Sequence, residues 1–88
     1  LLAIGKAFTA SGKFDLAVEQ LMVAKAEIQI MNDLKKDVIY QLGMAFEKSG
    51  KMKEAVDEYK AIYMADSGFR DVAKKINDFY ESQKSPSA

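Results

Sequence analysis

The sequence predicts an all-α protein: a right-handed α-solenoid of helix-turn-helix repeats, with about five helices and no sheet. Three observations support this prediction. The segment Leu1–Val18 recurs as Ile39–Val56, hydrophobic residues return every three or four positions, and a Ser-Gly pair follows the first helical stretch of each copy. Because no segment alternates hydrophobic and polar residues with a period of two, we expect no strand.

Identities between the two copies establish the repeat. Of the positions from Leu1 to Val18, eight are identical to their counterparts in the second copy. The identical pairs are Gly5/Gly43, Ala7/Ala45, Phe8/Phe46, Ser11/Ser49, Gly12/Gly50, Lys13/Lys51, Ala17/Ala55 and Val18/Val56. Small residues at repeated positions favour close approach of two helices, with Phe8 and Phe46 filling the space beside them. We therefore interpret the chain as an internal duplication.

The helices are expected at residues 1–10, 14–30, 33–48, 52–65 and 68–82. Gly12 and Gly50 can take the left-handed conformation that ends a helix. Asn32 is the expected N-cap of the third helix, and either Asp66 or Ser67 that of the fifth. The domain would then span residues 1–83, with one repeat at about 1–32 and the second at about 33–67.

The fifth helix, at about 68–82, is expected to cap the second repeat. It keeps a hydrophobic stripe of Phe69, Val72 and Ile76, but has Asn77 where the repeat has glycine. A terminal helix of this kind covers the last repeat without starting another. Residues 83–88 are polar, include the single Pro, and are expected to form a flexible tail.

The composition argues against several classes of function. The 88 residues include neither Cys nor His, which removes disulfides, thiolate or imidazole metal sites, and catalysis by cysteine or histidine. Thirteen basic residues balance 13 acidic ones, so neither nucleic acid nor a membrane is an expected partner. Three groups of charged residues could suggest catalysis: Asp33/Asp37, Asp57/Glu58 and Asp71/Lys74/Lys75/Asp78. The last has the spacing of an exposed helical ion-pair network, so we expect no enzyme and no cofactor.

The first residues of the chain do not have the pattern of a signal peptide. The hydrophobic run Leu1-Leu2-Ala3-Ile4 is interrupted by Gly5-Lys6, and no basic segment precedes it. A signal peptide or membrane span is therefore not expected there. The chain also lacks an initiator Met, which favours a piece of a longer protein, and we expect that protein to be cytoplasmic.

The repeated residues resemble the tetratricopeptide repeat, a helix-turn-helix unit of about 34 residues with the pattern W-x2-L-G-x2-Y, then A-x3-F, then P. The pattern falls on Leu1, Ile4, Gly5, Phe8, Ala17 and Leu21, and again on Ile39, Leu42, Gly43, Phe46, Ala55 and Tyr59. It covers residues 1 to about 68. The Trp position is aliphatic here, the Pro position holds Gln29 and Ser67, and the repeat is longer. We expect its four added residues, about one helical turn, to extend helices 14–30 and 33–48.

The resemblance implies a module that binds a peptide or partner protein in a groove lined by the first helix of each repeat. The matching groove positions are Leu2, Lys6, Thr9, Ala10, Asp37, Tyr40, Met44, Glu47, Lys48, Asp71, Lys74 and Asp78. Tyr40 and Met44 lie one turn apart and are the expected anchors. A chaperone-binding subclass of the family has Lys and Asn where this chain has Leu2 and Lys6, so a carboxylate clamp is not expected.

Other interpretations of these residues remain open. A Tyr or Met on a helix of such an array often packs against its neighbour instead of a ligand. The open N-terminal end could mediate self-association into a homo-oligomer. The segment could also regulate an enzyme whose catalytic domain lies outside it. Met22, Val23 and Ile30 lie off the main hydrophobic stripe and form an alternative contact surface.

Overall fold

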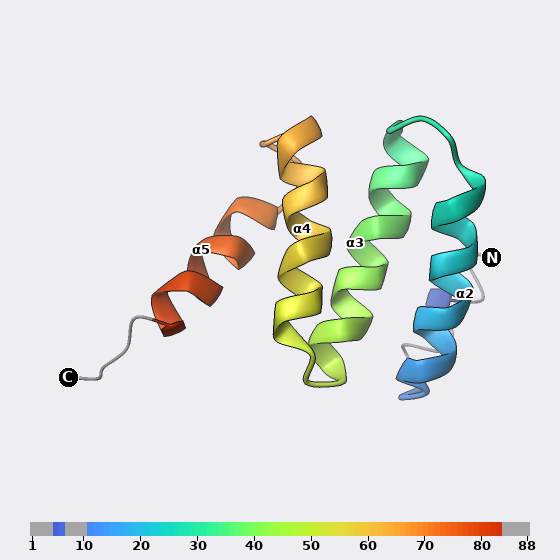
Figure 1. The fold of residues 1–88 in the computed structure, drawn as a ribbon, viewed down its shortest axis with the longest axis horizontal. Helices are drawn as coiled ribbons and strands as arrows, with labels where there is room; N and C mark the ends of the chain where they lie inside the picture. Colours follow the sequence, from blue (N-terminus) through green and yellow to red (C-terminus); the bar gives the residue numbers. More distant parts are fainter. Residues whose placement is uncertain (1–4, 7–10, 84–88) are drawn as a thin grey trace.

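The computed structural model describes residues 5–6 and 11–83, and every regular element in that part of the chain is an α-helix (Figure 1). The helices are α2 (Phe14–Glu27), α3 (Asp33–Lys48), α4 (Met52–Ala65) and α5 (Val72–Gln83). They stand side by side in chain order, each packed against the next (Figure 1). The all-α prediction is therefore confirmed for four helices packed against one another. Gly5 and Lys6 are helical, while the rest of the expected helix 1–10 lies outside the described residues.

Helices α3 and α4 begin and end at the predicted residues. Asn32 caps α3 as expected, because its side-chain oxygen accepts a hydrogen bond of 2.8 Å from the backbone N–H of Lys35. The turn after α3 has Gly50 at φ 85°, and the backbone N–H of Gly50 donates to the carbonyl of Glu47 at 3.0 Å. Gly12 has a matching φ of 82°. Both glycines thus adopt the predicted left-handed conformation.

Helix α2 is shorter than predicted, ending at Glu27 and not at residue 30. Ile28 is extended, with φ −98° and ψ 112°, and its side chain packs against the core between α2 and α3. The longer repeat therefore does not extend α2: residues 28–32 connect it to α3. The predicted extension of this helix was wrong: the chain leaves helical geometry at Ile28, whose partly buried side chain packs on the core.

Helix α5 begins at Val72, four residues later than predicted, and neither Asp66 nor Ser67 is its N-cap. Asp66 instead follows the end of α4, where its carboxylate accepts a hydrogen bond of 3.3 Å from the backbone N–H of Gly68. Arg70 then adopts a left-handed φ of 44°. This turn reverses the chain, which delays the start of the helix.

The core consists of two groups of buried side chains. The group between α2 and α3 contains Leu21, Ala24, Val38 and Leu42. The group between α3, α4 and α5 contains Ile39, Ala55, Tyr59, Ile62 and Val72. Phe46 packs against both groups and so connects them. No described helix has the length and apolar character needed to cross a bilayer.

The duplicated sequence makes the same helix contact twice. A Cβ placed on Gly43 would lie 2.5 Å from Cε1 of Tyr59, and one placed on Gly5 would lie 2.5 Å from Cγ of Leu21. The two pairs occupy equivalent positions in the two copies of the repeat. Since real Cβ atoms do not approach that closely, each glycine is required by the side chain opposite it. The prediction of close helix approach at these glycines is confirmed.

Candidate protein-binding surface

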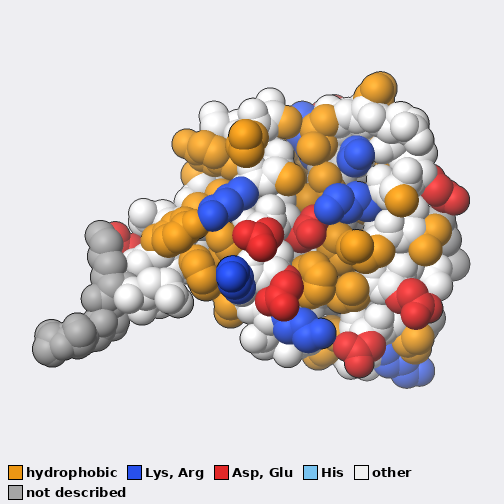
Figure 2. Space-filling model, in the orientation of Figure 1, with side chains coloured by type: hydrophobic (Ala, Val, Ile, Leu, Met, Phe, Trp, Pro, Cys, Tyr) orange, Lys and Arg blue, Asp and Glu red, His pale blue; other side chains and the backbone are white. Residues whose placement is uncertain are grey.

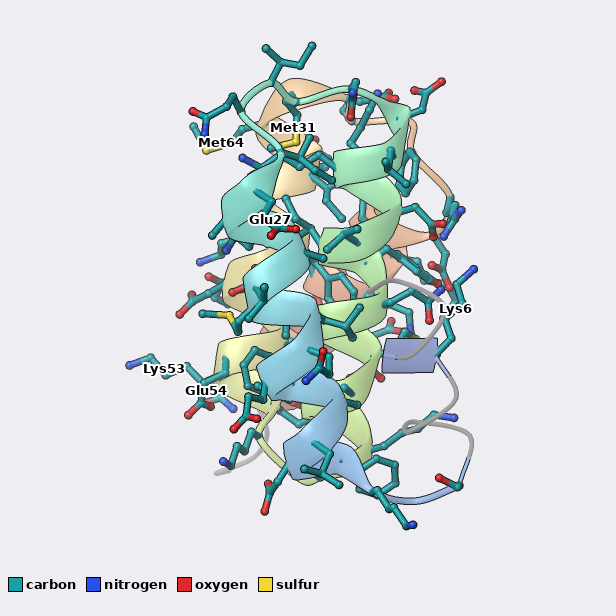
Figure 3. All side chains as sticks on the ribbon, turned by 90° about the vertical axis from the view of Figure 1, so that its right-hand side faces the viewer. Lys6, Glu27, Met31, Lys53, Glu54 and Met64 are labelled. Carbon is teal, nitrogen blue, oxygen red and sulfur yellow. The ribbon has the colours of Figure 1, made fainter. Side chains whose placement is uncertain are left out.

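The row of helices has two broad faces. Lys6 projects from one face, while Lys53, Glu54 and Met64 project from the other (Figure 3). We refer to the face with Lys6 as the inner face and to the face with Met64 as the outer face. Helical spacing places Asp37, the predicted anchors and Glu47 along one side of α3, and the Lys6–Asp37 contact places that side on the inner face.

Asp37 is the centre of a charged chain across the inner face. Its carboxylate lies 3.6 Å from the ammonium of Lys6 and accepts a hydrogen bond of 2.9 Å from Nη1 of Arg70. These contacts join the segment before α2, the second turn of α3 and the loop before α5. Two predicted groove residues, Lys6 and Asp37, are thus brought together, and Arg70, which the sequence did not single out, completes the group.

Tyr40 is held by contacts within the chain. Its ring lies 5.7 Å from that of Tyr59 and meets Phe69 edge-on at 6.2 Å, and the Arg70 guanidinium lies 4.9 Å from its centre. Its hydroxyl donates a hydrogen bond of 2.6 Å to Asp71. Burial, together with this hydrogen bond, raises the pKa of Tyr40 to about 12. Tyr40 is therefore half-buried and fixed in orientation.

Glu47 connects α3 to α4 and α5. Its Oε2 accepts a hydrogen bond from the hydroxyl of Tyr59 and lies 2.9 Å from the ammonium of Lys75. The Lys75 ammonium also lies 5.5 Å from the centre of the Tyr59 ring. Burial raises the pKa of Tyr59, and the Glu47 carboxylate raises it further. The fully buried tyrosine thus has a satisfied hydroxyl, at the edge of an open pocket.

The pocket beside Glu47 has a volume of about 360 Å³. Most of its lining residues belong to α4 and to α5, which slants away from α4 (Figure 1). Its lining consists of Glu47, Met52, Val56, Tyr59, Lys75, Asp78, Phe79, Ser82 and Gln83. The pocket therefore combines a hydrophobic wall with two acids and one ammonium, a composition that suits an apolar side chain next to a polar or charged one.

Besides Lys6, Asp37, Tyr40 and Asp71, the predicted groove residues divide into three groups. Glu47 and Asp78 line the pocket, and Lys74 is paired with Asp78 at 2.8 Å. Met44 is half-buried on α3 and Lys48 is exposed in its last turn. Leu2, Thr9 and Ala10 lie outside the described residues.

Comparisons with models of protein families, with curated proteins and with solved structures found no match to this chain.

The sequence did not identify the hydrophobic wall of the pocket or its lysine. Met52 and Val56 belong to a helical stripe that is typical of ordinary core, and Phe79 to that of the last helix. Lys75 meets Glu47 because of the angle at which α5 lies beside α4 (Figure 1), and no sequence pattern specifies that angle. Within residues 5–6 and 11–83, no three acidic side chains gather in a group that could hold a metal ion.

Proposed function

We propose that this chain is a non-enzymatic protein–protein interaction module, an adaptor or scaffold built as a right-handed α-solenoid of tetratricopeptide-like repeats. Its partner is a peptide or a segment of a protein, bound on the inner face. The recurrence of the glycine contacts at Gly5 and Gly43 supports the repeat architecture. The observation that carries the binding proposal is the pocket beside Glu47.

The chemistry of the pocket indicates what the partner presents. Met52, Val56 and Phe79 offer apolar surface for one hydrophobic side chain. Asp78 lies on the same rim, and its pairing with Lys74 is exposed to solvent, so a basic partner group can compete for it at little cost. We therefore propose a partner segment with a hydrophobic residue followed or preceded by Lys or Arg. Tyr40 and Met44 extend this surface along α3.

Peptide selection tests the proposal. The full chain would be used to select binders from a displayed random-peptide library, and the enriched peptides titrated against Met52→Glu. Met52 opens α4, where an acid is tolerated by the helix dipole, so this variant should fold. We expect it to bind at least about tenfold more weakly, because a charge enters the hydrophobic wall.

Met31→Glu is the matched control. Met31 has a similar exposure, 38% against 41% for Met52, and does not line the pocket. It should bind the selected peptides as tightly as the parent chain. Equal losses in the two variants, or no loss with Met52→Glu, would place the binding surface elsewhere.

Self-association is a second candidate, favoured by the exposed flank of α2. Leu16 and Val23 are each 44% exposed, whereas the equivalent positions of α4 hold Glu54 and Ala61. Light scattering should show a mass that rises with concentration for the parent chain and stays monomeric for Leu16→Glu/Val23→Ala. Met31→Lys, which places a charge on an exposed residue of the connection after α2, is the control and should behave as the parent does. A monomeric parent would exclude this candidate.

A further inference from the structure

A second groove lies on the outer face, between α4 and α5. It has a volume of about 450 Å³ and is lined by Lys60, Tyr63, Met64, Ala73, Ile76, Asn77 and Tyr80. Met64 is 86% exposed, and Tyr63 and Tyr80 are 45% and 42% exposed. Figure 2 shows hydrophobic side chains gathered over α4 and α5, with side chains of Lys or Arg beside them.

One side of the groove is a face of α5. The corresponding face of α3 is covered by α4. Val72 and Ile76 of α5 pack in the group shared with α4, as Val38 and Leu42 of α3 pack against α2. Val72 therefore corresponds to Val38, and the rest of α5 follows α3 in the same register. The residues that α3 turns to α4 are Ile39, Gly43 and Phe46. Their counterparts Ala73, Asn77 and Tyr80 line the open groove.

The other side of the groove is a strip of α4 whose counterpart on α2 is in contact with the next repeat. Lys60, Tyr63 and Met64 of the second copy correspond to Met22, Lys25 and Ala26 of the first. Lys25 lies 2.8 Å from Glu58 of α4. The groove between α4 and α5 is thus the counterpart of the place that α4 itself occupies, packed on α3 and joined to α2 by the Lys25–Glu58 ion pair.

We propose that the outer groove binds one amphipathic helix of a partner protein, which would pack on α5 and reach α4 as α4 packs on α3 and reaches Lys25 of α2. The repeat gives the groove a shape that corresponds to the site where α4 packs on α3. The exposed Tyr63, Met64 and Tyr80 supply apolar surface for the helix to bury. This site lies on the opposite face from the pocket beside Glu47, so the two proposals stand or fall separately.

The side chains of the groove set two requirements on the bound helix. Where α4 packs on α3, Gly43 makes room for the ring of Tyr59: a Cβ on Gly43 would lie 2.5 Å from Cε1 of Tyr59. In the outer groove, Asn77 of α5 takes the place that Gly43 has in α3. The bound helix therefore needs a small residue at the position where α4 has Tyr59. The ammonium of Lys60, 4.9 Å from the centre of the Tyr80 ring, favours an acidic residue nearby, as Lys25 pairs with Glu58.

Two peptides test the size requirement. Both have the sequence of residues 52–65 and are held helical by a lactam between Lys53 and Asp57, which are exposed in α4. One keeps Tyr59 and the other carries Tyr59→Ala. Fluorescence anisotropy would measure their affinity for the full chain. We expect the alanine peptide to bind about tenfold more tightly, because only it fits beside Asn77.

Variants at position 77 show whether that preference comes from the groove. Asn77→Gly restores the space that Gly43 gives, so the preference should reverse toward the tyrosine peptide. Asn77→Ala is the matched control: it removes the amide but keeps the Cβ, and should still prefer alanine. Circular dichroism checks that each variant keeps its helices. If Asn77→Gly loses helical signal, the preferences of the parent chain and of Asn77→Ala decide the question.

Chemical-shift mapping locates the bound peptide. We expect amide shifts at Tyr63, Ile76 and Tyr80. Binding by neither peptide, equal affinities in the parent chain, or a preference that a folded Asn77→Gly leaves unchanged would overturn the proposal. Shifts confined to Met52, Val56 and Phe79 would overturn it too, because they would place the peptide on the inner face.

Discussion

Gly43 and Tyr59 lie so close that a Cβ on the glycine would stand 2.5 Å from the tyrosine ring. The ring is fully buried, and its hydroxyl is held by Glu47 at the edge of the inner pocket. The close packing of α3 on α4 at Gly43 therefore also fixes the positions of Tyr59 and Glu47, which line the pocket proposed to bind a partner.

Enlarging Gly43 should destabilise the fold. Gly43→Ala places a methyl group against the Tyr59 ring and should lower the free energy of unfolding by about 1–3 kcal/mol. Gly68→Ala is the matched control, since its Cβ would meet only the Asp66 carboxylate, at 3.9 Å. Urea denaturation followed by circular dichroism measures both. Similar stability of the two variants would contradict the close approach.

Arg70 should tolerate glycine better than alanine. Its φ of 44° is unfavourable for any residue with a Cβ, and its guanidinium contacts with Asp37, Tyr40 and Phe69 help to hold it there. Both Arg70→Ala and Arg70→Gly lose these contacts, but only glycine relieves the backbone. The glycine variant should therefore be more stable by about 1 kcal/mol in denaturant titrations. The reverse order would contradict the left-handed conformation.

Tyr40 should make stability depend on alkaline pH. Its pKa is raised from 10 to about 12, so the unfolded chain loses this proton first as the pH rises. The stabilisation is fully present below about pH 10 and is lost as the pH approaches about 12. Tyr40→Phe should show a smaller loss of unfolding free energy across this range. Identical pH profiles for the two chains would exclude a buried, hydrogen-bonded Tyr40.

The last helix should be needed for a cooperative fold. Val72 is its fully buried side chain and packs with Tyr59 and Ile62. A chain ending at Asp66 would expose that surface, and we expect it to be less soluble and to unfold less sharply. A chain ending at Gln83 is the control and should behave as the full chain does. A soluble chain ending at Asp66 with an unchanged denaturant slope would show that α5 is dispensable.

The sequence specified helix faces well and helix ends less well. Helices 33–48 and 52–65 were predicted to the residue because Asn32, Gly50 and the spacing of hydrophobic residues are local signals. The end at Glu27 and the start at Val72 coincide with tertiary contacts: the packing of Ile28 on the core and the hydrogen bond from Arg70 to Asp37. Local patterns do not encode such contacts.

The candidate site was predictable only in part. The pattern placed Glu47 and Asp78 on one surface, and both line the same pocket. It could not show that the ring and hydroxyl of Tyr40 would be engaged by Phe69, Arg70 and Asp71, because these residues follow in a loop whose path the sequence did not define.

The most direct test of the central proposal is chemical-shift mapping of the full chain during titration with a peptide selected from the random library. We expect the largest amide shifts at Met52, Val56 and Phe79, with smaller ones along α3 from Tyr40 to Glu47. Shifts centred on α2, or spread evenly over the chain without saturation, would contradict partner binding through the inner face.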